Sequence, residues 1–212
     1  MSQSTLALHG GTPVRSKAWP RWPQWDETER SGLLAVLERG EWGGYDKAVR
    51  DFEAAFAARH AAAHCITTVN GTTTLETALR ALGVGAGDEV IVPPYTFVAT
   101  ASAVRIVGAT PVFADVELET WNLSLPAVEA AISERTKAVI PVHFGGLPVD
   151  LDALLPLAAR HGLAVIEDAA HAHGSSWNGK PVGALGTVGS FSFQASKNLT
   201  AGEGGALLTN DP

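Results

Sequence analysis

One lysine stands among serines, glycines and small apolar residues in the segment SFSFQASKNLTAGEGGAL, residues 190–207. Lysine side chains normally lie on solvated faces among other charges, where the ammonium group stays hydrated. Glu203 is the only other charged residue in this segment. A lysine removed from water has a lowered pKa and becomes an amine nucleophile, whose most familiar use is a Schiff base with a carbonyl compound. The segment therefore predicts a reactive lysine.

A second polar group, EDAAHAHG, follows the apolar run LAVI and contains Asp168, His171 and His173. An acid at the end of an apolar strand either points into a cleft or caps a helix. The two histidines, with Asp168 and His143, are also compatible with a metal site, so a metal hydrolase built on His143, His171 and His173 is the last of the alternatives. Because the third ligand is distant in sequence, we expect no metal.

The segment NGTTT follows the β-branched run HCITTV and opens a predicted helix. Gly71 would let the backbone approach a ligand, and Thr72 and Thr73 supply hydroxyls beside the free N–H groups of the first turn, which is how a helix start holds a phosphate. Ordinary capping by threonine is the alternative explanation. The segment is not a nucleotide P-loop, because no Gly-Lys-Ser/Thr follows.

Phe97, in the segment PPYTF after the run DEVIV, could lie flat on an aromatic ligand or belong to the core. A phosphate cradle, a stacking aromatic, a carboxylate and a sheltered lysine together meet the demands of pyridoxal phosphate. A buried Asp168 beside the pyridine nitrogen would keep that nitrogen protonated, so that the ring can accept electrons. Each feature is weak alone, and the combination predicts a pyridoxal phosphate site.

Composition limits the class of protein. The chain has 212 residues, 46% of them hydrophobic and 17% charged, with a formal net charge of −7. This charge, without a Lys/Arg cluster, argues against nucleic acid as a partner. The single cysteine, Cys65, excludes an internal disulfide. No apolar run approaches the roughly 20 residues of a membrane span, and the start MSQSTLALHGG does not resemble a secretory signal, so we expect a cytoplasmic protein without a membrane partner.

Helical and strand-like patterns alternate along the chain. Periodicity predicts helices over 26–40, 46–60, 72–82, 96–108, 125–132 and 150–162, and strands over 64–69, 88–93, 110–116, 137–144, 163–168, 190–193 and 205–209. Apolar strands separated by helices predict an α/β fold, a three-layer sandwich with a mostly parallel central sheet. Ligands bind such sheets beyond the carboxyl ends of the strands.

The predicted domain organisation has two parts. Residues 1–25 form an extended Pro- and Trp-rich arm, and residues 26–212 form a large α/β domain. Trp19, Trp22 and Trp25 either pack on the body of the protein or contact a second subunit.

The chain resembles the DegT/DnrJ/StrS family of sugar aminotransferases, within the fold-type I enzymes. The resemblance runs from about Arg21 to the end of the chain, on the blocks NGTTTLETALRALGVGAGDEVIVPPYTFVATASAV, KAVIPVHFGG, VIEDAAHAHGS and SFSFQASKNLTAGEGGAL. Members are roughly twice this long, so the resemblance implies a large domain that is incomplete at its C-terminal end, with the small domain missing.

The resemblance implies a role for each site residue. Lys197 would form the Schiff base with the cofactor and move the proton between substrate and cofactor, and Asp168 would pair with the pyridinium. The resemblance also implies that the phosphate is bound by Gly71, Thr72, Thr73 and Ser192. Phe97 would stack on the face of the cofactor ring, and His171 would lie close to the ring. Relatives that catalyse dehydration carry histidine at the lysine position, so a lysine at 197 favours transamination.

The family reaction implied is ping-pong transfer of an amino group from glutamate or glutamine to a nucleotide-linked keto-sugar or a cyclitol ketone, by a homodimer whose partner chain contributes to the pocket. The segments AWPRWPQWDETER and SFQASKN are more similar to aminocyclitol and aminobenzoate-pathway members than to lipid-sugar members. Two alternatives stay open: another fold-type I activity, such as a desulfurase or an aldolase, and a catalytically inactive remnant that binds the cofactor or a partner.

Overall fold

The computed structural model describes residues 5–212, which form two compact units divided after Glu41. The first unit contains a short 3₁₀ turn (Ala7–His9), an extended stretch and helix α1 (Glu27–Arg39). Asp26 is the N-cap of α1, and its carboxylate accepts a hydrogen bond from the Thr28 N–H at 2.7 Å. The structure thus groups α1 with the preceding stretch, while the predicted division after residue 25 stays a prediction.

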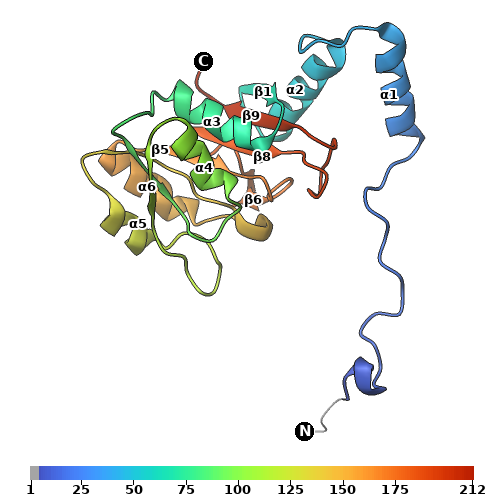
Figure 1. The fold of residues 1–212 in the computed structure, drawn as a ribbon, viewed down its shortest axis with the longest axis horizontal. Coiled ribbons are helices and arrows are strands. Elements are labelled where there is room, and N and C mark those ends of the chain that lie inside the picture. The colour runs from blue at the N-terminus through green and yellow to red at the C-terminus, as the bar shows by residue number, and fades with distance from the viewer. Residues whose placement is uncertain (1–4) are drawn as a thin grey trace. The chain divides into compact units, whose positions relative to one another are not determined.

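The second unit is built on one seven-stranded sheet (Figure 1). Its strands are β1 (His64–Thr68), β2 (Glu89–Val92), β3 (Thr110–Phe113), β4 (Thr136–Val139), β5 (Ala164–Asp168), β8 (Val188–Ser192) and β9 (Gly205–Thr209). They are arranged in the order β1-β9-β8-β5-β4-β2-β3, and only β9 runs antiparallel to its neighbours. The expected mostly parallel sheet is confirmed.

Helices cover both faces of this sheet. They are α2 (Lys47–Arg59), α3 (Gly71–Ala81), α4 (Ala99–Ile106), α5 (Leu125–Ala131) and α6 (Leu151–His161). Successive strand residues point to opposite faces, so Ile166 of β5 packs in the core under α3 and α4, while Val165 packs in the core under α2, α5 and α6. This arrangement confirms the expected three-layer sandwich, whose helices flank the sheet in Figure 1.

A two-stranded hairpin outside the main sheet was not predicted. It pairs β6 (Ser176–Trp177) with β7 (Lys180–Pro181) through Asn178 and Gly179, whose φ angles are 48° and 78°. Both angles are left-handed, and Asn-Gly is the usual pair for such a turn.

Residues far apart in sequence meet at the carboxyl edge of the sheet. β5 and β8 are parallel neighbours, so Asp168 and Ser192 end up at the same edge. Helices α3 and α4 begin there because each follows the carboxyl end of a strand. No helix in the described residues 5–212 is both long and apolar enough to cross a membrane.

Candidate active site

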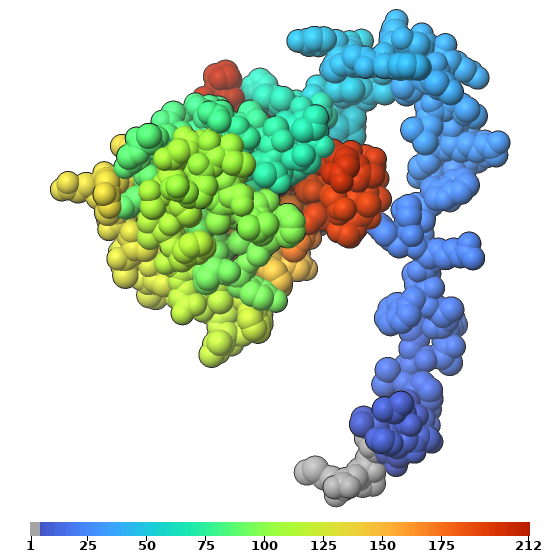
Figure 2. All heavy atoms as spheres, in the orientation of Figure 1, coloured from blue at the N-terminus to red at the C-terminus, as the bar shows by residue number. Residues whose placement is uncertain are grey.

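A cavity of about 720 Å³ opens at this carboxyl edge. Its wall comes from the start of α3, the segment before α4, the segment after β4, the turn after β5 and the turn after β8. The lining residues are Asn70, Gly71, Thr72, Leu75, Tyr95, Thr96, Phe97, Ala99, Val142, Phe144, Asp168, Ala170, His171, Ser192, Gln194, Ser196, Lys197 and Glu203. Figure 2 shows the start of α3 in teal beside the turn after β8 in red.

Asp168 is the buried acid of the cavity, with 6% of its surface exposed. Thr100 of α4 donates its hydroxyl to one carboxylate oxygen at 2.8 Å, and the Ala170 N–H donates to the other at 3.3 Å. These two donors fix the plane of the carboxylate. The Thr100 contact was not foreseen, although Thr100 is preceded by Thr96 one helical turn earlier, and their hydroxyls lie 2.8 Å apart.

Lys197 is half-buried in the same cavity. It follows β8 in a turn that its own backbone closes, since the Lys197 N–H donates to the Gln194 carbonyl at 2.8 Å. Burial lowers the pKa of the Lys197 amine, while the negative charge of Asp168 opposes this effect only in part. The lysine therefore has the electrostatic setting of an amine that can act as a nucleophile.

The start of α3 lies directly against β8. A Cβ at Gly71 would come within 2.7 Å of the Ser192 Cβ, so a glycine is needed for this approach. Asn70 caps the helix, and both the N–H and the hydroxyl of Thr73 donate to its side-chain oxygen, at 2.9 and 3.0 Å.

Two backbone donors stay free in this first turn. Among the residues that the structure describes, the N–H groups of Gly71 and Thr72 have no hydrogen-bond partner. Free N–H groups at a helix start suit an anion. Gly71, Thr72 and Ser192 line the cavity, whereas Thr73 does not and instead serves the Asn70 cap.

Aromatic side chains form the outer part of the cavity. Phe97 lines it and is 68% exposed, so it is not a core residue. The Tyr95 and Phe144 rings, whose centroids lie 4.5 Å apart, also line it and were not predicted. Phe144 lies in a 3₁₀ turn after β4, and no sequence pattern marks this turn as part of a site.

His171 faces the cavity and contacts the edge of Phe144 at 5.7 Å between ring centroids. Its Nδ1 accepts a hydrogen bond from the Gly145 N–H at 3.4 Å. Burial lowers the pKa of His171, as does the nearby Lys197 charge, and the Asp168 charge offsets part of both. The ring is thus held in its neutral form.

The three histidines considered for a metal point to different surroundings. His171 faces the cavity, His143 is bonded to Glu167, and His173 packs against Phe191 and Phe193. Across residues 5–212 no three His, Cys, Asp or Glu side chains form a group suited to a metal ion. The geometry therefore gives no support to the metal hydrolase alternative.

The residues present fit pyridoxal phosphate. Free N–H groups at the start of α3 suit the phosphate, and the close approach that Gly71 permits brings them to Ser192. The buried, doubly hydrogen-bonded Asp168 suits a ring nitrogen, and the half-buried Lys197 amine suits the aldehyde. The fold is that of the fold-type I aminotransferases, and the cavity is lined by groups of the kinds that this cofactor needs.

The chain belongs to the DegT/DnrJ/EryC1/StrS aminotransferase family, which it matches over residues 23–212. The resemblance seen in the sequence is confirmed. L-Glutamine:scyllo-inosose aminotransferase of Streptomyces griseus is 50% identical over 214 residues, which cover 98% of this chain and 50% of that protein.

Two solved structures show the same fold. The crystal structure of 3-amino-5-hydroxybenzoic acid synthase superimposes with a TM-score of 0.90 at 47% identity, covering 93% of this chain and 52% of the other. Spr1654 of Streptococcus pneumoniae, solved in its PLP-form, superimposes with a TM-score of 0.84 at 33% identity, covering 90% and 52%. The chain spans about half the length of the relatives it matches.

Proposed function

We propose that this chain carries the cofactor site of a pyridoxal-phosphate-dependent aminotransferase. The observation that carries the proposal is one cavity that holds both the half-buried Lys197 amine and the buried Asp168 carboxylate. When bound, the cofactor supplies an aldehyde and an electron-accepting ring. Such a site needs a nucleophilic amine, an anion beside the ring nitrogen and a phosphate-binding helix start, and the cavity lining includes a candidate for each.

Each site residue has a task that its surroundings support. Lys197 would hold the cofactor through its aldehyde and would carry the proton at its Nζ atom. Asp168 would accept a hydrogen bond from the protonated ring nitrogen, and Thr100 and Ala170 already hold its carboxylate in place. Gly71, Thr72 and Ser192, which line the cavity, would bind the phosphate.

Phe97 and His171 border the cofactor ring. Both residues line the cavity, so Phe97 would cover one face of the ring and His171 would lie beside it. Thr73 contributes to the phosphate site indirectly, since its hydrogen bonds to Asn70 shape the first turn of α3.

The relatives' names suggest the substrates. We propose glutamine as the amino donor and a cyclitol ketone as the acceptor, because the relative from S. griseus is an L-glutamine:scyllo-inosose aminotransferase. Glutamate as donor and a nucleotide-linked keto-sugar as acceptor are the second choice. The expected homodimer and cytoplasmic location stay predictions, as does the incomplete large domain.

Borohydride trapping tests this proposal. The purified chain with added pyridoxal phosphate should give a visible absorbance band, and reduction should leave the cofactor covalently attached to Lys197, as measured by peptide mass spectrometry. Lys197→Met should abolish the label, whereas Lys180→Met, a change at an exposed lysine of β7, should leave it unchanged. A label spread over surface lysines, with none at Lys197, would contradict the assignment.

The inactive-remnant alternative is separated by a second measurement. If an unreduced sample of the chain binds the cofactor but exchanges no amino group with glutamine or glutamate, the remnant is favoured. Measured amino exchange by the chain alone rejects the remnant. The desulfurase and aldolase alternatives predict turnover of other amino acids and none with glutamine.

A further inference from the structure

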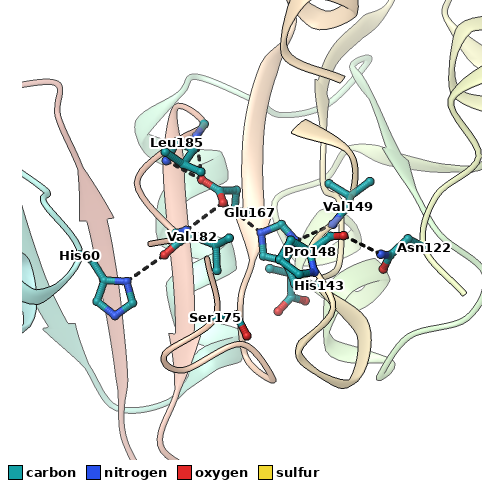
Figure 3. Close-up of polar contacts among 12 residues, drawn as sticks. His60, Asn122, His143, Pro148, Val149, Glu167, Ser175, Val182 and Leu185 are labelled. Atoms are coloured by element: carbon teal, nitrogen blue, oxygen red, sulfur yellow. Dashed lines mark hydrogen bonds and ion pairs between the residues drawn. The ribbon is translucent and has the colours of Figure 1, made fainter. Parts of the chain in front are cut away.

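Glu167 precedes the cavity acid on β5, so its side chain points to the opposite face of the sheet. It is fully buried, and its carboxylate accepts four N–H hydrogen bonds (Figure 3). One oxygen accepts from His143 Nε2 at 2.9 Å and from the Gly183 N–H at 2.8 Å. The other accepts from the Leu185 and Gly186 N–H groups at 2.8 and 2.7 Å.

These donors keep the buried carboxyl ionised. Burial, the largest effect, raises the pKa of Glu167, but the hydrogen bonds from His143 and from the backbone outweigh it and hold the pKa below its ordinary value. A buried carboxylate with all its hydrogen-bonding positions filled is costly to disturb, because removing one partner leaves the others unsatisfied.

His143 is locked in one tautomer. Its Nδ1 accepts a hydrogen bond from the Val149 N–H at 3.2 Å, so Nδ1 carries no proton and Nε2 is the donor to Glu167. The ring is therefore neutral although it faces a carboxylate. The backbone N–H of the same residue donates to the Asp168 carbonyl at 3.1 Å, which ties His143 to the cavity acid as well.

The network joins three segments that meet at the cavity. His143 follows β4, Glu167 and Asp168 end β5, and residues 183–186 lead into β8, which ends at Ser192. Figure 3 shows these contacts converging on Glu167, and the same loop is held from its other side where His60 Nδ1 donates to the Val182 carbonyl at 2.8 Å. Two of these segments end at cavity residues: β5 ends at Asp168 and β8 ends at Ser192.

We propose that Glu167 and His143 are positioning residues that act from the far face of the sheet to hold the Asp168 carboxylate at the ring nitrogen of the bound cofactor. The proposal rests on the proposed function. Neither side chain lines the cavity, so each acts only through the backbone of β5 and its neighbours.

Glu167→Gln is a severe change despite its equal size. Both carboxylate oxygens accept from two donors each, so the amide NH₂ group must face two N–H groups in either orientation. His143 cannot relieve this conflict by moving its proton to Nδ1, because Nδ1 faces the Val149 N–H. His143→Gln keeps a donor for Glu167, whereas His143→Leu removes it.

The test follows the protonation of the cofactor ring rather than activity. Pyridoxal phosphate labelled with nitrogen-15 in the ring is bound to each variant of the chain, and the ring-nitrogen resonance is recorded against pH below the melting temperature. In Glu167→Gln and His143→Leu the pH at which the ring loses its proton should fall by about one unit, a tenfold change in the protonation equilibrium. Asp168→Asn should lower it at least as far, and His143→Gln should restore much of the loss.

Glu89→Gln is the matched control. Glu89 is also a buried glutamate with side-chain donors, Ser133 and Arg135, but it begins β2 and so lies at the amino edge of the sheet. The Glu89→Gln substitution should lower the melting temperature without changing the pH at which the cofactor ring loses its proton. If Glu167→Gln and His143→Leu lower only the melting temperature, the positioning role is overturned while the proposed function stands. If the unchanged chain binds no labelled cofactor, both proposals fail.

Discussion

The half-buried His173 lies against two phenylalanine rings, with centroids 5.4 Å from Phe191 and 5.5 Å from Phe193. Neither ring nitrogen has a hydrogen-bond partner among the residues that the structure describes. Burial, reinforced by the charge of Lys197, lowers the pKa of His173 to about 4, although polar atoms of Asn198 and Ser192 offset part of the effect. The folded state therefore holds this ring neutral where an unfolded chain would protonate it.

This difference predicts loss of stability in mild acid. Because the pKa of His173 is lower in the folded state, the unfolded state binds more protons between pH 6.5 and about 4, and the free energy of unfolding falls as the pH falls through that window. His173→Leu should remove about 2 kcal/mol of that loss, allowing for partial solvent contact. Urea unfolding at several pH values measures it.

His161→Leu, a change at an exposed histidine at the end of α6, is the control substitution. His60 is also buried with a lowered pKa, so some slope should remain in the His173 variant. A slope that is the same with and without His173 would show that another group causes the acid sensitivity.

At the scale of elements, two helices of the second unit begin with the same kind of cap but in different places. Asn70 caps α3 at the cavity through the Thr73 N–H, and Asp150 caps α6 through the Ala153 N–H at 3.1 Å, away from the cavity. Asn70→Ala and Asp150→Ala should each lower the free energy of unfolding by about 1 kcal/mol.

Only Asn70→Ala should also weaken the binding of pyridoxal phosphate, by about threefold to tenfold, because the first turn of α3 offers its free N–H groups to the phosphate. An absorbance titration of each variant with the cofactor measures this effect. If both substitutions weakened cofactor binding equally, general stability and not the start of α3 would control binding.

Most helices and strands were predictable because apolar periodicity is a local property of the sequence. The pattern in DLDALLPLAARHG predicted α6, and LAVIED predicted β5. The β6–β7 hairpin was missed although Asn178-Gly179 signals such a turn, since two-residue strands leave no periodic pattern. β9 runs antiparallel because the chain re-enters the sheet from the carboxyl edge, directly after the turn that follows β8. The local sequence of β9 carries no signal for this direction.

The lysine and the buried acid that line the cavity were predictable from the sequence, whereas the residues that support them were not. Lys197 and Asp168 stand out because charged groups are unusual in apolar company. Glu167 stands beside Asp168 with the same charge, yet only the sheet shows that the two side chains face opposite ways and that His143 is the partner of Glu167. Pairings across 24 residues depend on strand order, which periodicity does not encode.

At the scale of the whole molecule, one cavity of the described chain is lined by Lys197, Asp168 and the start of α3, while the chain spans half the length of its relatives. The cavity is also bordered by apolar surface. Phe97 and Val98 are 68% and 66% exposed at the start of α4, and Leu199 is exposed in the turn after Lys197. Exposed apolar side chains beside a ligand cavity favour coverage by a protein partner.

We expect that partner to be a second copy of the chain, in agreement with the homodimer that the resemblance implies. Val98→Glu should weaken self-association by about tenfold or more, because a charge placed inside an interface loses its water. Ile106→Glu is the control: Ile106 is 52% exposed at the other end of the same helix, where the amino edge of the sheet lies. Sedimentation equilibrium of the three proteins measures their dissociation constants. A monomeric unchanged chain, or equal weakening by both substitutions, would show that the surface around Val98 is not where two copies meet.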